Sequence, residues 1–122
     1  MASISERDID NLLRILDYCD RIDEIVYRFG DSLGSFIKDV DYQDAVKMNI
    51  FQIGETVNNL SEDCKETAGD VPWHQIYGMR NIIAHGYEKV NDERIWETVK
   101  EDIPELKSKV EGMLKQEGID TK

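Results

Sequence analysis

Cysteine and histidine are scarce in this chain of 122 residues, which has only two of each. With no Cys-x-x-Cys pattern, these side chains are too few for a structural zinc site, and we expect neither a metal nor another cofactor. Cys19 and Cys64 each fall on an apolar helical face, where small thiols are commonly buried. We therefore expect both cysteines to stay reduced.

Long apolar runs and a leader sequence are also missing. No run approaches the roughly 20 apolar residues that span a bilayer, and residues 1–8 lack the basic and then apolar order of a signal peptide. These absences predict a cytoplasmic protein without membrane association. A length of 122 residues without internal repeats fits a single domain with one core.

Basic residues are outnumbered by acidic ones, 15 to 26, which gives a formal net charge of −11. Indiscriminate nucleic-acid binding rests mainly on lysine and arginine neutralising phosphates, so the composition argues against it. Activity on RNA would need a local basic patch. Arg80 with Lys89 and Arg94 could supply one, although scattered solvated charges are the commoner explanation of the last two. The acidic surface equally suits a basic partner.

The alternation of apolar and polar residues that is typical of β-strands is absent as well, whereas apolar residues recur at helical spacing. Ser5 to Asp8 resembles a helix-capping box, and the first helix is expected to run from there to Gly30. Residues 31–39 are expected to form a connection in which Phe36 and Ile37 pack against the core.

Asp41 is expected to cap a second helix that continues to Gly69. One face of this helix should turn to the core, with an apolar stripe of Val46, Ile50, Ile53, Val57, Leu60 and Cys64. The opposite face has a mixed line of Met48, Phe51, Gln52, Glu55 and Asn59. A helix with two such faces either contacts two neighbouring helices or joins a partner subunit, and we favour the subunit. Within that line, Glu55 could be a structural carboxylate or could orient residues of the next helix.

Pro72 is expected to open a third helix in its first turn, and Gly86 to close it in the left-handed conformation. Its expected apolar contacts are Trp73, Ile76, Tyr77, Ile82 and Ile83. Asn91 is expected to cap a fourth helix that Pro104 kinks or restarts, before a tail that frays from Gln116. These segments predict an all-α, up-and-down bundle of four main helices in one domain over residues 1–122, with its core at about 5–115.

Residues 73–87 concentrate a tryptophan, both histidines, an arginine and two tyrosines around the pattern Arg80-x4-His85-x-Tyr87. Arginine is a permanent cation whose planar fork matches phosphate oxygens, and histidine can take and give a proton near neutral pH. Asn81 can fix orientation by hydrogen bonds. Together these side chains suit phosphoryl transfer.

Helix geometry sets a condition on that hypothesis. At about 100° per residue, Asn81 and His85 are neighbours one turn apart, whereas Arg80 and His85 lie roughly 140° apart around the axis. They meet only if Arg80 reaches round, if the last turn is distorted, or if a second subunit completes the site. From spacing alone, a histidine at a helix end is more often part of a cap, and an arginine five residues earlier more often a surface charge.

Several segments together resemble the HepT toxin family of the HEPN superfamily, over residues from about 8 to 115. They are Gln52–Glu55, Leu60–Ser61, Pro72–Trp73, Gly78–Tyr87, Trp96 and Ile103–Leu106. The pattern of Arg, four to six residues, and His is weak by itself. In this order with the upstream segments it is a strong signature, and the motif positions show no departure from it.

The resemblance implies the toxin of a type VII-like toxin–antitoxin module, a metal-independent endoribonuclease that acts as a homodimer with both motifs facing one cleft. RNA cleavage through the 2′-OH needs a base, an acid and a cation on the phosphorane. His85 of each subunit would be the acid and the base, Arg80 would bind the phosphate, and Asn81 would hold the imidazole or the phosphate. The resemblance also makes Tyr87 a target for AMPylation by a cognate nucleotidyltransferase antitoxin.

Other interpretations remain open. HEPN-like domains can be non-catalytic nucleotide-binding or complex-forming modules that partner a minimal nucleotidyltransferase, and a purely structural helical dimer is a third class. Tyr87 could merely pack at the helix end. Trp73 and Tyr77 could stack on bases, although aromatics one turn apart are more often core, and His74 matches no position of the family pattern.

Overall fold

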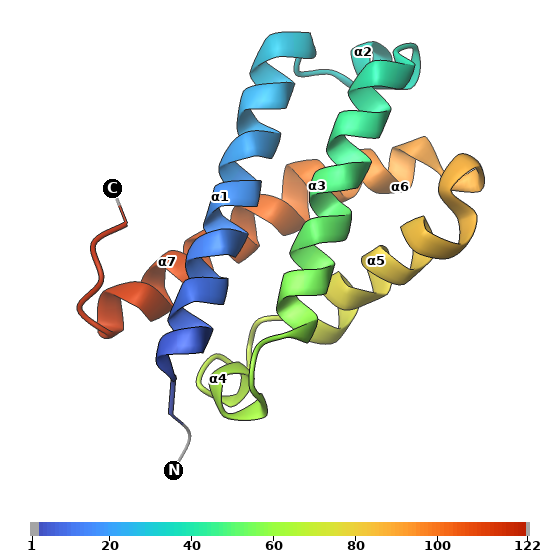
Figure 1. The fold of residues 1–122 in the computed structure, drawn as a ribbon. Helices are drawn as coiled ribbons and strands as arrows, with labels where there is room; N and C mark the ends of the chain where they lie inside the picture. The colour runs from blue at the N-terminus through green and yellow to red at the C-terminus, as the bar shows by residue number, and fades with distance from the viewer. Residues whose placement is uncertain (1–2, 122) are drawn as a thin grey trace.

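Residues 3–121 are described by the computed structural model, apart from the side chain of Glu88, and their regular structure is entirely helical (Figure 1). The four main helices are α1, α3, α5 and the continuous run from α6 to α7. This confirms the predicted all-α bundle. In chain order the elements are α1 (Glu6–Phe29), α2 (Leu33–Ile37), α3 (Val40–Asn58), α4 (Glu62–Glu66), α5 (Trp73–Gly86), the 3₁₀ turn η1 (Tyr87–Lys89), α6 (Asp92–Glu97), the π turn η2 (Thr98–Asp102) and α7 (Ile103–Gln116).

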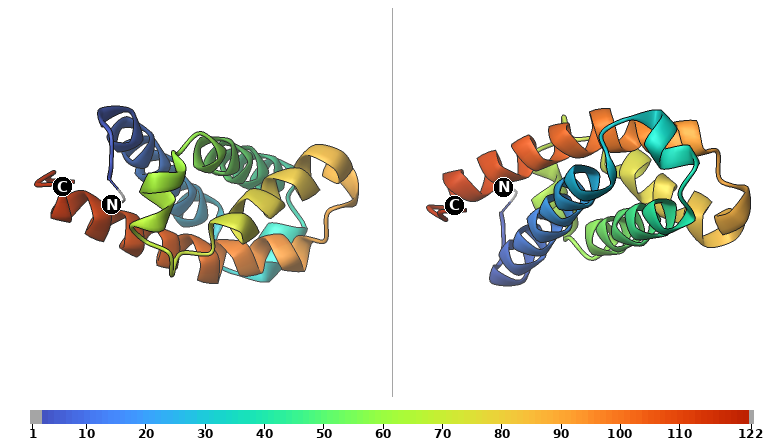
Figure 2. Two further views of the ribbon diagram at one scale, coloured as in Figure 1. Left: turned by 90° about the horizontal axis from the view of Figure 1, so that it is seen from below. Right: turned by 90° about the horizontal axis from the view of Figure 1, so that it is seen from above.

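α3 packs against two antiparallel neighbours (Figure 1). α1 and α3 lie side by side in opposite directions, and α5 leaves the lower end of α3 and runs outward beside it (Figure 1). The run from α6 to α7 then returns across one face of the α1–α3 pair, as the two end views show (Figure 2). α3 is therefore the central helix, with α1 on one side and α5 on the other.

The start of α1 is tied to the start of α4 through one buried carboxylate. Ser5 and Asp8 form the predicted capping box, with both hydrogen bonds at 3.1 Å. Asp8 also accepts hydrogen bonds from the amide and hydroxyl of Ser61, at 2.9 and 2.7 Å. Although burial opposes ionisation, these hydrogen bonds hold the pKa of the Asp8 carboxyl below its usual value.

Two predictions about the second helix are wrong. Its N-cap is Asp39, whose carboxylate accepts from the amides of Asp41 and Tyr42, so Asp41 lies in the first turn. The helix also ends at Asn58 rather than Gly69, because Ser61 caps the separate helix α4 by accepting from the amide of Cys64. The apolar stripe is nevertheless buried throughout, since Leu60 and Cys64 turn back into the same core.

Residues 31–39, predicted as a connection, contain the short helix α2. Phe36 is fully buried as predicted, but Ile37 is half exposed, and its predicted packing against the core is wrong. Phe36 and Tyr42 meet edge to face with centroids 5.1 Å apart, and Trp96 lies 5.5 Å from Phe36. The Tyr42 hydroxyl donates to the carbonyl of Gly30 at 2.9 Å, so this aromatic group closes one end of the bundle.

The fourth helix begins at Asn91, whose side chain accepts from the amide of Arg94 as predicted. Pro104 lacks an amide hydrogen, and the chain widens into the π turn η2 just before it, then restarts as α7. Where fraying was predicted from Gln116, two bonds close α7 in a Schellman arrangement. Gly118, at φ 79°, donates to Lys115, and Ile119 donates to Leu114.

One continuous apolar core lies between these helices and includes both cysteines, which are free. Burial raises the pKa of the Cys19 thiol to about 12 and that of Cys64 to about 11, so neither is a reactive thiolate near neutral pH. In the described part of the chain, no helix combines the length and apolar character that crossing a membrane requires.

Candidate active site

α5 is fixed at its start by a tryptophan. Pro72 occupies the N-cap position rather than the first turn, and its carbonyl accepts from the amide of Ile76. The Trp73 indole N–H lies 3.2 Å from the carbonyls of both Lys65 and Ala68. This bond anchors α5 against α4 and gives Trp73 a structural role.

The core face of α5 differs from the prediction at two positions. Ile82, expected in the core, is 48% exposed, whereas the unpredicted Met79 is buried. Met79 lies three residues after Ile76 and four before Ile83, so these three share one side of the helix. Ile82 lies on a different side of the helix, toward the solvent.

The predicted end of α5 is wrong in its geometry. Gly86 has φ −150° and ψ 41°, which is not left-handed, and among residues 3–121 only Gly30 and Gly118 have positive φ. The chain passes from α5 directly into the 3₁₀ turn η1. His85 still lies in the last turn of α5, and η1 carries Tyr87 back toward α3.

Arg80 points from α5 toward α3. Its Nε donates to Glu55 Oε1 at 2.7 Å, and its guanidinium carbon lies 5.0 Å from the centroid of the Phe51 ring. On its own helix, Nη1 donates to Asn81 Oδ1 at 3.0 Å, and the Tyr77 ring lies 5.9 Å away. These bonds use two of the five N–H groups of arginine, and the side chain is 23% exposed, so donors remain for a phosphate.

Gly54 explains how α3 and α5 come so close at Arg80. A Cβ at position 54 would lie only 2.3 Å from the Cβ of Arg80, a distance that real Cβ atoms do not show. Glu55 follows directly and pairs with the same arginine. Glu55 thus lies at the motif and holds Arg80 in place, an ion pair that fits both a structural and an orienting carboxylate. The Gln52–Glu55 segment was the signal for this contact.

Two residues of the line on the outer side of α3 pack against Arg80 of α5. Phe51 and Glu55 contact Arg80, whereas Met48 is 54% exposed and Asn59 is also exposed. Contact with a second neighbouring helix is observed, and contact of this face with a partner subunit stays a prediction. The exposed residues Met48 and Asn59 are free to contact another molecule.

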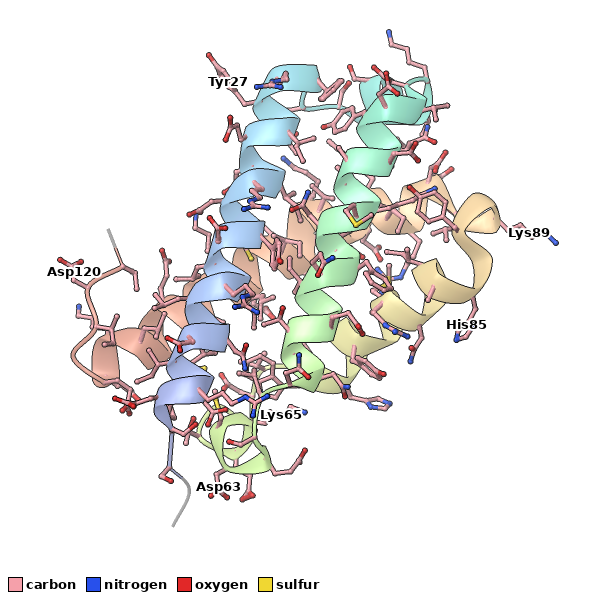
Figure 3. All side chains as sticks on the ribbon, in the orientation of Figure 1. Tyr27, Asp63, Lys65, His85, Lys89 and Asp120 are labelled. Atoms are coloured by element: carbon pink, nitrogen blue, oxygen red, sulfur yellow. The ribbon has the colours of Figure 1, made fainter. Side chains whose placement is uncertain are left out.

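His85 does not meet Arg80 within one chain. Its side chain is exposed near the end of α5 and points away from the bundle (Figure 3). Arg80 turns the other way, toward Glu55. Asn81 connects the two sides, because it accepts from Arg80 and lies one turn below His85 on the same helix face.

Tyr87 is held by two residues of α3 that the sequence did not single out. Its hydroxyl donates to Asp44 Oδ1 at 2.7 Å. Lys47, which is only 5% exposed, donates to the Tyr87 carbonyl at 3.1 Å, and its Nζ lies 4.7 Å from the ring centroid. Burial, the hydrogen bond to Asp44 and the charge of Asp44 raise the pKa of Tyr87 to about 12. Tyr87 thus stays a neutral, 38% exposed phenol.

The other predicted basic residues do not form one patch with Arg80. Arg94 pairs with Glu97 at 3.1 Å and with Asp102 at 3.7 Å, so its charge is compensated within its own helical segment. Lys89 is exposed in η1 beyond the end of α5 (Figure 3). Local compensation is thus the better account of Arg94.

Comparison with known families gives one match that covers most of the chain. The family described as HepT-like ribonuclease matches residues 15–113, which include Arg80, Asn81, His85 and Tyr87. No solved structure matches the chain significantly.

Curated relatives agree with this match. A "Putative RNase" of Caldanaerobacter subterraneus subsp. tengcongensis is 39% identical over 106 residues, which cover 87% of this chain and 93% of the relative. A "Probable ribonuclease HepT" of Thermococcus cleftensis is 39% identical over 80 residues, covering 66% and 73%. A "Putative RNase" of Methanocaldococcus jannaschii is 33% identical over 85 residues, covering 62% and 78%.

Proposed function

Because the chain belongs to the HepT-like ribonuclease family, we propose that it is a toxin that cleaves RNA internally without a metal ion. The observation that carries the proposal is the geometry of Arg80. This cation is held in place by Glu55 and Asn81, has donors to spare, and lies on the helix that ends at the exposed His85.

The reaction that fits these groups needs no outside nucleophile. A base removes the proton from the RNA 2′-OH, and the 2′-oxygen attacks the adjacent phosphorus. An acid protonates the leaving 5′-oxygen, so the products are a 2′,3′-cyclic phosphate and a 5′-hydroxyl. Arg80 stabilises the phosphorane by hydrogen bonds to its equatorial oxygens, which charge assistance makes strong.

A homodimer would supply both proton-transfer groups. One chain offers a single histidine at the motif, and that histidine does not contact its own Arg80. Two chains that face each other across α5 would place two copies of His85 at one phosphate, one as base and one as acid. Asn81, which already bonds Arg80, would keep the guanidinium turned toward the face that carries His85.

Cleavage is expected to persist in EDTA and to leave 2′,3′-cyclic phosphate ends, because no step of this mechanism uses a metal. The measurement is gel analysis of a labelled RNA with and without chelator, with mass spectrometry of the ends. Arg80→Ala is the control for contaminating nuclease and should be inactive. Activity that stops on chelation, or that leaves 3′-hydroxyl ends, would contradict the mechanism.

We also propose that Tyr87 is the residue through which the toxin is neutralised, by AMPylation from a nucleotidyltransferase antitoxin. Its side chain is partly exposed, its hydroxyl donates to Asp44, and Lys47 lies beside the ring. In the transfer, the phenolic oxygen gives its proton to Asp44, which already accepts from it. The oxygen bonds to the α-phosphorus of ATP, and pyrophosphate leaves. The attached phosphate would bring negative charge to the end of the motif helix, where the RNA phosphate must bind.

Incubation with the antitoxin, ATP and magnesium should raise the intact mass of the wild type by one or more AMP groups. Tyr87→Phe should keep its mass, because it lacks the acceptor oxygen, while its contact with Lys47 is preserved. Tyr27→Phe is the matched control, since Tyr27 is 90% exposed on α1. An equal mass increase in Tyr87→Phe would exclude Tyr87 as the acceptor.

A second candidate is a non-catalytic nucleotide-binding or complex-forming module that partners a minimal nucleotidyltransferase. The formal charge of −11 and the existing pair of Arg80 with Glu55 favour it, because both weaken attraction to a polyanion. In the chelator experiment, wild-type protein that leaves RNA intact would favour this module over the nuclease.

A further inference from the structure

One side of α5 forms a continuous exposed strip. It consists of His74, Tyr77, Gly78, Asn81 and His85, each of which has another member three or four residues away, so they lie along one face of the helix. Each is exposed or half exposed. From His74 to His85 the strip is about 16 Å long, at 1.5 Å per residue. It therefore extends well beyond the space that one phosphate at Arg80 and His85 occupies.

A surface pocket of about 300 Å³ continues the strip at the start of α5, where α3, α4 and α5 meet. Its polar lining residues are Asn58, Glu62, Lys65, His74 and Tyr77. Lys65 lies below α3 at the opposite end of α5 from His85 (Figure 3). Its partner is Glu62 at 3.6 Å, and that carboxylate is 87% exposed, so the pair is weak and Lys65 can turn to a phosphate.

Gly78, in the middle of the strip, has no explanation in the fold. A Cβ there would meet nothing within 4 Å, in contrast to Gly54. Glycine inside a helix costs about 1 kcal/mol relative to alanine, and no close packing offsets that cost here. Because Gly78 has no side chain, nothing projects from the helix at this position between His74 and Asn81, and a ligand can approach the helix backbone there.

The charge of this region differs from that of the rest of the chain. Residues 71–87 contain no aspartate or glutamate, although the whole chain has 26. The strip contains both histidines and is bordered by Arg80 and Lys65. Of the acidic groups beside it, Glu55 is paired with Arg80 at 2.7 Å, whereas Glu62 is exposed and only weakly paired with Lys65 at 3.6 Å. A polyanion is thus repelled less here than over the acidic surface elsewhere.

We propose that this strip and the pocket bind the segment of single-stranded RNA that flanks the cleaved phosphodiester. In this arrangement Tyr77 stacks on a base, and Lys65 and His74 bind a phosphate. The ribose and the base that follow lie across Gly78. This inference rests on the proposed ribonuclease function and assigns the path of the substrate away from the reacting atoms.

The test compares cleavage of dinucleotides with cleavage of unstructured octaribonucleotides, both as mixed-sequence pools. The wild type should cleave octanucleotides with the higher kcat/KM. In the double variant Lys65→Gln, His74→Gln, that value should fall about tenfold, with a shallower salt dependence because phosphate contacts are lost. Dinucleotide cleavage should be unchanged. Lys38→Gln, on an exposed lysine between α2 and α3, is the control for charge and should match the wild type.

Three results would overturn the inference. Equal kcat/KM for both substrates in the wild type would show that no flanking segment is bound, while the ribonuclease function would stand. The double variant could also lose kcat/KM because it self-associates more weakly, which sedimentation would show. In that case the strip is a contact between two copies of the chain and not an RNA subsite. If the wild type cleaves neither substrate, the ribonuclease function fails. Binding of the octanucleotide, measured by fluorescence anisotropy, then tests the subsite by itself. Equal affinity of the wild type and the double variant would overturn the subsite.

Discussion

Replacing His85 by alanine is expected to lower RNA cleavage by about 10²- to 10⁴-fold, the range that a positioned acid or base contributes. The fold should be unaffected, because the side chain is exposed on the last turn of α5. Single-turnover cleavage and urea unfolding, measured on the same preparations, separate the two effects. A variant that keeps most of the wild-type activity would remove His85 from the mechanism.

Mixing experiments with this variant test whether two chains share one site. If each cleft needs His85 from both subunits, randomly assembled equal mixtures of wild type and His85→Ala should keep about a quarter of the activity, because only wild-type pairs are complete. Independent sites would keep half. Co-expression with distinguishable tags gives the random mixture, and a mixture of wild type with Lys38→Gln is the control that should keep full activity.

Replacing Gly54 by alanine is expected to destabilise the protein by about 1–3 kcal/mol, the usual cost of overpacking. The new methyl group would lie 2.3 Å from the Arg80 Cβ, so α3 and α5 must separate. The hydrogen bond between Arg80 and Glu55 should weaken with them, and RNA cleavage should fall together with stability. Urea midpoints and cleavage rates measure both effects.

Gly78→Ala is the matched control for this substitution. Both glycines lie inside helices, but a Cβ at position 78 meets nothing within 4 Å. The higher helix propensity of alanine should therefore raise the free energy of unfolding by about 1 kcal/mol. If Gly54→Ala unfolds at the same urea concentration as the wild type, the close approach at Arg80 does not require glycine.

The local patterns were sufficient for most of the secondary structure. The capping box at Ser5 and Asp8 and the cap at Asn91 are formed by side chains that bond amides three residues away, so a short stretch of sequence contains all the information. Periodicity likewise identified the buried face of α3. It could not locate the break after Asn58, because the apolar spacing continues through the turn into α4.

The end of α5 shows why a single glycine is a weak guide to backbone conformation. The His85–Gly86 pair predicted a left-handed cap, but Gly86 stays in the helix and the chain tightens into η1. The contacts that hold this turn come from α3, where Lys47 and Asp44 bind Tyr87 across 40 and 43 positions of sequence. No spacing rule near residue 86 contains that information.

The sequence by itself determined the helical class, the main apolar faces and the family, because each depends on residues near one another in the chain or on their order along it. Only the tertiary structure decided the surroundings of Arg80. Gly54, Glu55 and Phe51 reach it from another helix, and their roles follow from a close approach between two backbones. Such contacts depend on how whole helices pack against each other. The entire core decides that packing, and the spacing of residues within one helix does not.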